Sequence, residues 1–298
     1  MTQLQYKLFE FIYTSGLAPE LETSLLEDFK LNEVDVEDVY CDTQLSKFEV
    51  RPEYIYVALQ FPVFDKAKQG FLIKDLHCFW SDKQVIIIDR QNYKHFTQFI
   101  NFQNQLLEDE EVITPGLFVA ELLDFCMTKT YKAIMKFKTD IAQVESDLFT
   151  FMDDIDVLKD ILTIKKNLVN FESVITPIQR VIRDLESKNK DRFSQEELER
   201  IDNSLDTINK MLNNLSNFQD QMDILMDTND SMMIRSTSLN SKNISVVAIF
   251  GFASIFALSL INSLRTGIVE GNWIFLLLIL ALLVLITSGF YLIKKSNK

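Results

Sequence analysis

Residues 244–264 decide the architecture of this protein, and they read Ile-Ser-Val-Val-Ala-Ile-Phe-Gly-Phe-Ala-Ser-Ile-Phe-Ala-Leu-Ser-Leu-Ile-Asn-Ser-Leu. These 21 residues carry no charged side chain, and residues 273–293 form a second charge-free run of the same length. A helix needs about 20 residues, at about 1.5 Å each, to cross roughly 30 Å of hydrocarbon. Two neighbouring runs of this length predict two transmembrane helices at the C-terminal end rather than a buried hairpin of a soluble protein.

The charges around the two runs predict their orientation. Basic side chains lie before the first run and after the second, and they are Arg235, Lys242, Lys294, Lys295 and Lys298. The connection, residues 265–272, has Arg265 as its only basic residue. Since Lys and Arg accumulate on the cytoplasmic side, we expect both termini, with a basic tail at residues 294–298, in the cytoplasm. The short external loop and the absence of a signal-peptide pattern fit an integral protein of a prokaryotic inner or plasma membrane.

Charge is divided unequally along the chain, whose formal net charge is −13. From residue 242 onward five basic residues face one acidic residue, a net of +4, so residues 1–241 carry −17. An acidic body is a poor partner for nucleic acid, because phosphates need clustered Lys and Arg. With Gly at only 7 positions, no phosphate-binding loop can be assembled, and no Ser/His/Asp pattern is present. We therefore expect neither an enzyme nor a covalently bound cofactor.

Residues 1–114 are expected to form a cytoplasmic α/β domain. Short β-branched or aromatic stretches predict strands at residues 6–13, 54–61, 70–79 and 84–89, with a hairpin turn at residues 81–83. From Pro115 the spacing of apolar residues becomes helical, so residues 115–241 are predicted to be a helical bundle and stalk. The predicted fold class is an α+β membrane protein, with an N-terminal α/β domain, a long helical stalk and the two transmembrane helices.

One helix is predicted to run from Gln195 into the first membrane span. Ser194 and Glu197 have the spacing of a capping box, which marks a helix start, and no Pro follows before the end of the span. Apolar residues recur every three or four positions, as in a coiled-coil seam, at Leu198, Ile201, Leu205, Ile208, Leu212 and Leu215. An isolated rod on the order of 100 Å long is not plausible, so the seam implies partner helices from the same chain, from other copies or from both.

The first span, residues 242–264 with its flanking Lys, has one small and hydroxylic face. At about 100° per residue, the side chains that share a sector of about 60° are those of Ser241, Ser245, Ala248, Phe252, Ser259 and Ser263. Asn262 lies just outside this sector. A hydroxyl or amide in contact with lipid is unfavourable, so this face either packs against another helix or lines a polar path.

Three segments of the cytoplasmic part carry a family resemblance. They are Arg51-Pro-Glu-Tyr-Ile-Tyr-Val-Ala-Leu-Gln-Phe-Pro, Leu158-Lys-Asp-Ile-Leu-Thr-Ile-Lys-Lys-Asn-Leu and Ile175-Thr-Pro-Ile-Gln-Arg-Val-Ile-Arg-Asp-Leu. With the two C-terminal spans, they resemble the CorA family of divalent-cation channels and transporters. The resemblance implies a homopentamer in the lipid bilayer whose first spans surround a pore. It also implies that divalent cations, Mg²⁺ above all, are the substrate and, when bound by cytoplasmic acidic side chains, a signal that closes the pore.

The external end of the first span departs from the family. The family's motif there is Gly-Met-Asn, whose Asn meets the hydrated cation, whereas this sequence has Leu260-Ile261-Asn262-Ser263. Counting back from Trp273 aligns Asn262 with the motif's Asn, but matching the residues at the start of the span aligns Leu264 instead. We favour Asn262 as the selectivity residue. The missing Gly-Met supports a second hypothesis, a non-conducting CorA-like sensor or interaction protein anchored in the membrane.

Acidic residues could act on cations at further places. Glu270 is the only acid of the external loop and could attract cations to it. The carboxylates of Asp153, Asp154 and Asp156 follow the first long helix and are candidate regulatory ligands, because clustered carboxylates suit hard cations. The acidic runs at residues 33–38 and 108–111 are candidates of the same kind. For each of these groups, a solvated surface charge is the alternative.

Overall fold

The computed structural model describes residues 2–18, 20–41, 45–65, 70–91, 96, 98–101, 113–150, 155–188 and 192–265, with the single positions 280, 284 and 287. The chain divides into two compact units. The first contains Met1–Asp147 and Asp156–Leu225, and the second contains Leu148–Ile155 and Met226–Lys298. The second predicted span therefore lies, apart from three positions, outside the described residues.

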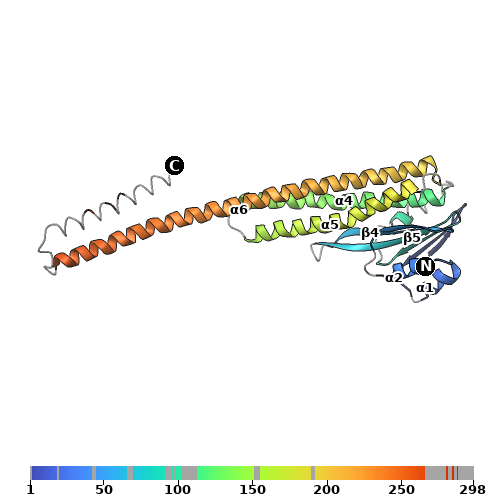
Figure 1. Ribbon diagram of the computed structural model, residues 1–298, viewed down its shortest axis with the longest axis horizontal. Helices are drawn as coiled ribbons and strands as arrows, with labels where there is room; N and C mark the ends of the chain where they lie inside the picture. Colours follow the sequence, from blue (N-terminus) through green and yellow to red (C-terminus); the bar gives the residue numbers. More distant parts are fainter. Residues whose placement is uncertain are drawn as a thin grey trace. The chain divides into compact units, whose positions relative to one another are not determined.

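The first unit is built on a six-stranded sheet (Figure 1). Its strands are β1 (Thr2–Gln5), β2 (Glu10–Ser15), β3 (Lys47–Val50), β4 (Ile55–Asp65), β5 (Gly70–Trp80) and β6 (Gln84–Asp89), in the spatial order β1-β2-β6-β5-β4-β3. Neighbours pair antiparallel except β2 and β6, which run parallel with Phe11 opposite Val85. The sheet thus joins the N-terminal hairpin to strands that follow it by about seventy residues.

The predicted strands are confirmed in the middle of the sheet and wrong at its start. Ser81 N–H donates to the carbonyl of Gln84 at 2.8 Å, which closes the predicted hairpin between β5 and β6. The strand expected at residues 6–13 is instead a turn followed by most of β2, because Tyr6 N–H donates to the carbonyl of Phe9 at 2.9 Å. Aromatic side chains inside that turn mimic the alternation of a strand.

One face of the sheet is covered by the short helices α1 (Leu21–Thr23) and α2 (Glu33–Tyr40), with the π-helical turn η1 (Ser24–Asp28) between them. Their apolar side chains join those of the strands in one buried core, which includes Leu25, Val36, Val39, Tyr56 and Phe79. Asn32 caps α2 by accepting a hydrogen bond from Val34 N–H at 3.0 Å. The acidic run at residues 33–38 therefore lies in a helix docked on the sheet.

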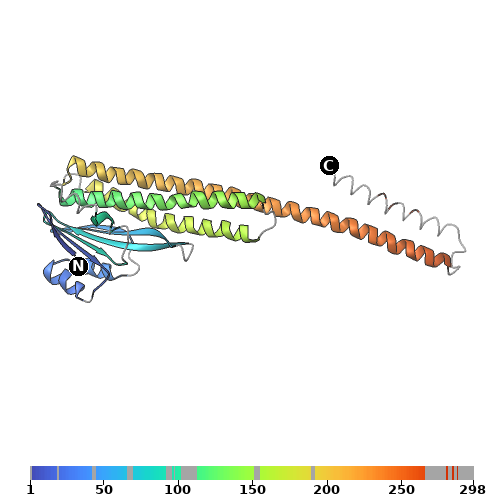
Figure 2. The ribbon, with the colours of Figure 1, turned by 180° about the vertical axis from the view of Figure 1, so that it is seen from behind.

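The long helices α4 (Pro115–Thr150) and α5 (Ile155–Lys188) cover the other face (Figures 1 and 2). Phe118 of α4 is fully buried, and the rings around it, with centroids 4.8 to 5.7 Å away, are those of Tyr6, Phe9, Phe11 and Phe99. Phe71 of β5 contacts both helices, with its centroid 5.2 Å from Phe137 and 5.0 Å from Phe171. Aromatic packing therefore fixes both helices on the sheet.

The last helix, α6 (Gln195–Arg265), has 71 residues and begins with the predicted capping box. Ser194 N–H donates to Glu197 Oε2 at 2.8 Å, and Glu197 N–H donates to Ser194 Oγ at 3.3 Å. Glu197 also accepts a 2.5 Å hydrogen bond from Thr114 Oγ1 just before α4, so its buried carboxylate joins the first turns of two helices. A Cβ on Gly116 would lie 2.5 Å from Glu197 Oε1, so a larger residue there would displace this carboxylate from its hydrogen bonds.

Half of the apolar positions predicted for the coiled-coil seam of α6 are buried, namely Ile201, Ile208 and Leu215. Buried positions alternate in steps of three and four, at Ile201, Ser204, Ile208, Met211, Leu215, Phe218, Met222 and Leu225. The predicted Leu198, Leu205 and Leu212 are only partly buried. Ser204 takes the place expected for Leu205, and it can do so because its hydroxyl donates to the carbonyl of Arg200 at 3.2 Å. Partner helices from the same chain therefore cover this seam.

Candidate functional site

The C-terminal part of α6 is the only helix in the described part of the chain that is long and apolar enough to cross a membrane. None of its most apolar window is buried within the chain. Exposed apolar side chains include those of Ile244, Val247 and Ile255, each about two-thirds accessible. An apolar helix surface of this size needs an apolar environment from outside the chain.

The predicted polar face of this segment is uncovered. Ser241, Ser245, Ala248, Phe252 and Ser259 are all exposed, Phe252 to 66%. The partly covered positions of the segment are Val246, Ile249, Ala253, Phe256 and Ala257. At about 100° per residue, these lie on a stripe centred about 100° away from the polar face. The less accessible positions of the helix thus lie apart from the hydroxylic face, which is exposed.

Hydroxyl groups of the segment are satisfied inside the helix. Ser245 Oγ donates to the carbonyl of Ser241 at 2.8 Å, and Ser254 Oγ donates to the carbonyl of Phe250 at 2.8 Å. These bonds use the hydroxyl hydrogens and leave the oxygen lone pairs free to accept. On the predicted polar face the oxygen of Ser245 can therefore accept a hydrogen bond from water or contact a cation.

The predicted selectivity region, Leu260 to Ser263, lies in the last turns of α6, which ends at Arg265. Ile261 and Asn262 are exposed, and the side chains of Leu260 and Ser263 lie outside the described part. Asn262 is about 60° from Ser259 around the helix, whereas Leu264 is about 140° from it. The helix therefore brings Asn262 nearer to the polar face than Leu264, although its role stays a prediction.

The other predicted acidic sites lie mostly outside the described residues. This holds for Glu270, Asp153 and Asp154, and for the run at residues 108–111. Asp156 lies in the first turn of α5 and is exposed. Among the residues described, no three His, Cys, Asp or Glu side chains come together as they would around a metal ion. The carboxylates of Asp153, Asp154 and Asp156 stay a prediction as regulatory ligands.

The acidic run at residues 33–38 has a structural role in this chain. Arg51 donates to both oxygens of the buried Asp35, Nε at 2.8 Å and Nη2 at 2.6 Å, and Tyr54 OH donates to Oδ2 at 2.7 Å. Burial acts to raise the pKa of Asp35, but the bonds from Arg51 and Tyr54 outweigh it and hold the pKa below its usual value. Asp38 pairs with Lys47. These carboxylates hold α2 on the sheet.

His77 has a structural role inside the sheet. It is 1% exposed on β5, and its Nδ1 lies 2.8 Å from Tyr56 OH. Burial, with the nearby charges of Arg90 and Lys47, lowers the pKa of His77 to about 3. The imidazole is therefore neutral over the physiological pH range.

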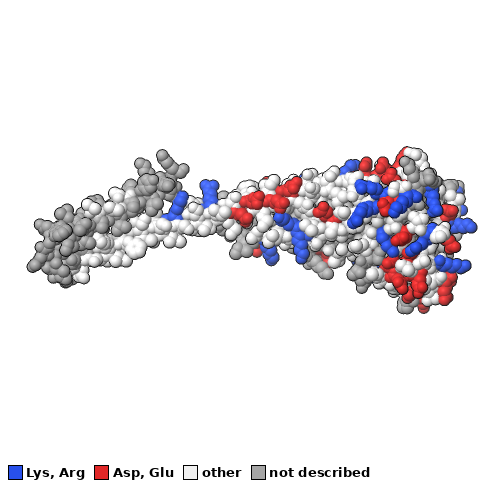
Figure 3. Space-filling model, in the orientation of Figure 1, with Lys and Arg blue, Asp and Glu red and all other residues white. Residues whose placement is uncertain are grey.

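A row of aspartates on α6 was not predicted from the sequence as part of a site. Asp220, Asp223, Asp227 and Asp230 follow one another in steps of three, four and three, so they share one side of the helix. All four are exposed, and Asp223 forms an ion pair of 2.5 Å with Lys165 of α5. Figure 3 shows acidic side chains gathered on α6 ahead of its charge-free apolar segment. Their helical spacing, visible in the sequence, is the signal that could have identified them.

A six-stranded sheet packed on three long helices, the last of which becomes apolar, is the fold of divalent-cation transporters of the CorA type. The CorA magnesium transporter from Methanocaldococcus jannaschii matches with a TM-score of 0.78 at 14% identity, over 99% of this chain and 94% of that one. The full-length CmaX protein matches with a TM-score of 0.77 at 13% identity, over 97% and 89% of the two chains. The cytoplasmic domain of ZntB from Vibrio parahaemolyticus matches with a TM-score of 0.51 at 17% identity, over 75% and 89%.

The sequence itself gives the same answer. The profile of the CorA-like Mg²⁺ transporter proteins matches residues 9–251. The chain belongs to this family. No curated protein matches the sequence. Membership extends from the sheet through the bundle into the apolar segment of α6, and it agrees with the expectation of a transporter rather than an enzyme.

Proposed function

We propose that this protein is a homopentameric channel for divalent cations, with Mg²⁺ as the main substrate. The observation that carries the proposal is the uncovered hydroxylic face of α6. Because one side of the helix is partly covered while the face with Ser241 and Ser245 is open, this face is free to meet the same face of other copies around an axis. Oxygen acceptors around that axis would form a polar path through the membrane.

The proposed topology has the first span at residues 242–264, an external loop at residues 265–272 and a second span at residues 273–293. Arg235 and Lys242, both exposed on α6 before the apolar segment, support cytoplasmic termini. A prokaryotic inner or plasma membrane is the proposed location. In this arrangement Asn262 and Glu270 lie at the external end, where the cation enters the pore.

Charge supports cations as the cargo. The aspartates at positions 220, 223, 227 and 230 precede the span on one helix, and a fivefold ring would multiply their negative field. Flux then follows the electrochemical gradient, without a nucleotide. Cytoplasmic cations, bound by carboxylates such as those of Asp153, Asp154 and Asp156, would regulate it, because clustered carboxylates bind hard cations well.

Two serines provide a matched test of the polar path. Ser245 lies on the proposed pore face, and Ser254 lies about 180° away on the same helix with an identical bond to its own backbone. In proteoliposomes, Ser245→Leu should abolish Mg²⁺ uptake, and Ser254→Leu should leave it within about twofold of the unchanged protein. Equal inhibition by both substitutions would reject the assignment of the pore face.

Size and selectivity can be tested in the same preparation. The detergent-solubilised oligomer should have a protein mass of five times 34.7 kDa, about 174 kDa. Asn262→Ala should reduce Mg²⁺ uptake, whereas Asn243→Ala, at the other end of the span and off the polar face, should not. Intact pentamers that pass no Mg²⁺, Zn²⁺, Co²⁺ or Ni²⁺ would refute the channel and support the non-conducting alternative.

A further inference from the structure

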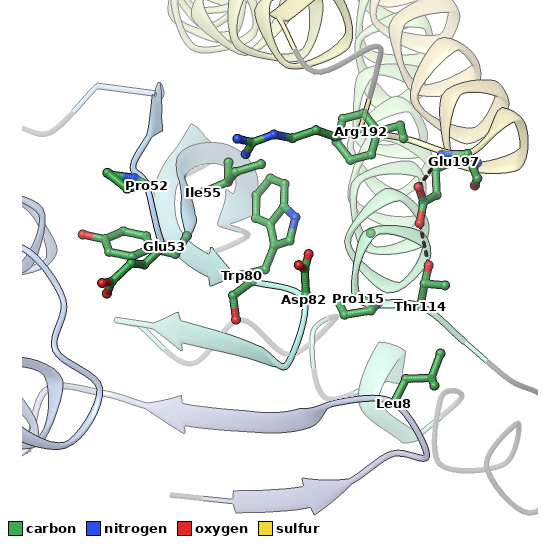
Figure 4. A pocket seen from close by; sticks show the side chains of 15 residues that line it. Leu8, Pro52, Glu53, Ile55, Trp80, Asp82, Thr114, Pro115, Arg192 and Glu197 are labelled. Carbon is green, nitrogen blue, oxygen red and sulfur yellow. Dashed lines mark hydrogen bonds between the residues drawn. The ribbon is translucent and has the colours of Figure 1, made fainter.

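A cleft of about 760 Å³ opens in the first unit, where the strand ends of the sheet meet the beginnings of α4 and α6. Figure 4 shows Trp80 at the end of β5, Pro115 at the start of α4 and Arg192 ahead of α6 around this space. Its volume lies in the range of sites that bind small organic molecules. Nothing in the proposed ion path uses it.

Trp80 gives the cleft an unpartnered hydrogen-bond donor. The side chain is 6% exposed, and within the described part of the chain its indole N–H makes no hydrogen bond. Figure 4 shows the indole nitrogen on the side of the ring that faces Pro115 and Asp82. The nitrogen itself stays accessible, since it is not among the fully buried unpartnered polar atoms of the described residues, so it can donate to an acceptor bound in the cleft.

Opposite charges face the cleft without neutralising each other. Arg192 and Asp82 both line it and are exposed, and neither forms an ion pair or hydrogen bond with another described residue. Glu197, also in the lining, is different, because Thr114 and Ser194 occupy its two oxygens. Trp80, Ile55 and Pro115 supply an apolar floor. The unused groups are therefore the guanidinium of Arg192, the N–H group of Trp80 and the carboxylates of Asp82 and Glu53.

We propose that this cleft binds a small zwitterionic molecule with an apolar body. Its anionic group pairs with Arg192 and accepts the hydrogen bond of Trp80 N–H, and its cationic group pairs with Asp82. A purely anionic ligand would be repelled by Asp82 and the neighbouring Glu53, and a purely cationic one by Arg192. A short peptide with free termini has this chemistry. The site goes beyond the proposed ion passage and does not depend on it.

Fluorescence of Trp80 provides the test in the full-length protein in detergent. The chain has two Trp residues, so Trp273→Phe makes Trp80 the only one. The probes are the dipeptide phenylalanylalanine, its N-acetyl form, which lacks the cation, and its amide, which lacks the anion. The free dipeptide should change the emission saturably and bind about tenfold or more tightly than either blocked form, as expected for a charge-assisted hydrogen bond.

Substitutions of Arg192 and Asp82 test which end of the ligand each residue binds. Arg192→Gln should weaken the free dipeptide about tenfold and leave the amide unchanged, whereas Asp82→Asn should weaken the dipeptide and leave the N-acetyl form unchanged. Lys83→Gln, in the same turn but outside the lining, is the matched control. Circular dichroism should be unaltered, since neither charge has a partner in the described chain. No saturable change with the dipeptide, or equal affinity for all three probes, would overturn the proposal.

Discussion

Large apolar side chains are buried in the sheet and helical bundle but exposed along the apolar end of α6. In the first unit, large aromatic residues such as Phe118 and Tyr56 are fully buried, and the buried Asp35 has its hydrogen-bond partners within the chain. Along the apolar end of α6, Ile244 and Phe252 are about two-thirds exposed. The first unit is stabilised by internal contacts, whereas the exposed apolar side chains of α6 are those that the proposed membrane and pentamer would cover.

Two phenylalanines test this contrast with the largest expected effect. Phe118→Ala removes a ring that packs on four others and should lower the free energy of unfolding by about 3–5 kcal/mol. Phe252→Ala, on the proposed pore face, should leave that free energy unchanged and alter only ion flux. Denaturant unfolding of the solubilised protein, followed by circular dichroism, measures both. Similar losses would mean that Phe252 is packed in the assembly, and the contrast would fail.

The buried ion pair gives the next effect. Asp35→Asn should destabilise the first unit by about 2–3 kcal/mol, at the low end for a broken buried pair because Arg51 keeps 30% exposure. Since the folded-state pKa of Asp35 is lowered, its stabilisation is complete above the unfolded value of about 3.9. It is lost as the pH falls through the lower folded pKa. Unfolding at pH 7 and pH 3 measures this, and Asp82→Asn, without a partner, should show no loss at either pH.

Alanine substitutions at two glycines, one in each region, should change the stability in opposite directions. Gly116→Ala should destabilise by about 1–3 kcal/mol, because its Cβ would meet the carboxylate of Glu197. A Cβ on Gly251 meets nothing within 4 Å in the chain, so Gly251→Ala should stabilise α6 by up to about 1 kcal/mol. Thermal unfolding of the two variants compares them directly. A destabilised Gly251→Ala variant would show that another subunit approaches α6 closely at this point.

The smallest effect is expected on the exposed surface of the first unit. Lys165 and Asp223 form a pair between α5 and α6 in which Asp223 is 63% exposed. Asp223→Asn should cost less than about 1 kcal/mol, because solvent screens an exposed pair. A double-mutant cycle with Lys165→Met measures the coupling. A coupling above about 2 kcal/mol would mean that the pair is buried in the oligomer.

The helices could be predicted from the sequence better than the sheet. Pro115 and the capping box of Ser194 and Glu197 are local signals, and the absence of Pro after them is enough to predict one continuous α6. The parallel pairing of β2 with β6 joins segments far apart in the chain, and no local pattern encodes it. The turn at Tyr6 lacks Gly, Pro, Asn and Asp, so it could not be told from a strand.

The polar face of α6 could be predicted from the sequence, but the exposure of its side chains could not. Helical spacing alone grouped Ser241, Ser245 and Ser259. The spacing could not tell how accessible each position of α6 is, because accessibility depends on tertiary packing. The cleft beside Trp80 could not be predicted from the sequence either. Asp82 and Arg192 line the same cleft only because the sheet packs against the helix ends.

The unbroken course of α6 has a consequence for how its two ends are connected. Its 71 residues form one helix with a contour length of about 100 Å. The helix contains no proline, and Gly251, within the apolar segment, is its only glycine. The buried Glu197 and the predicted selectivity residue Asn262 therefore belong to the same element, and no loop separates them along the chain.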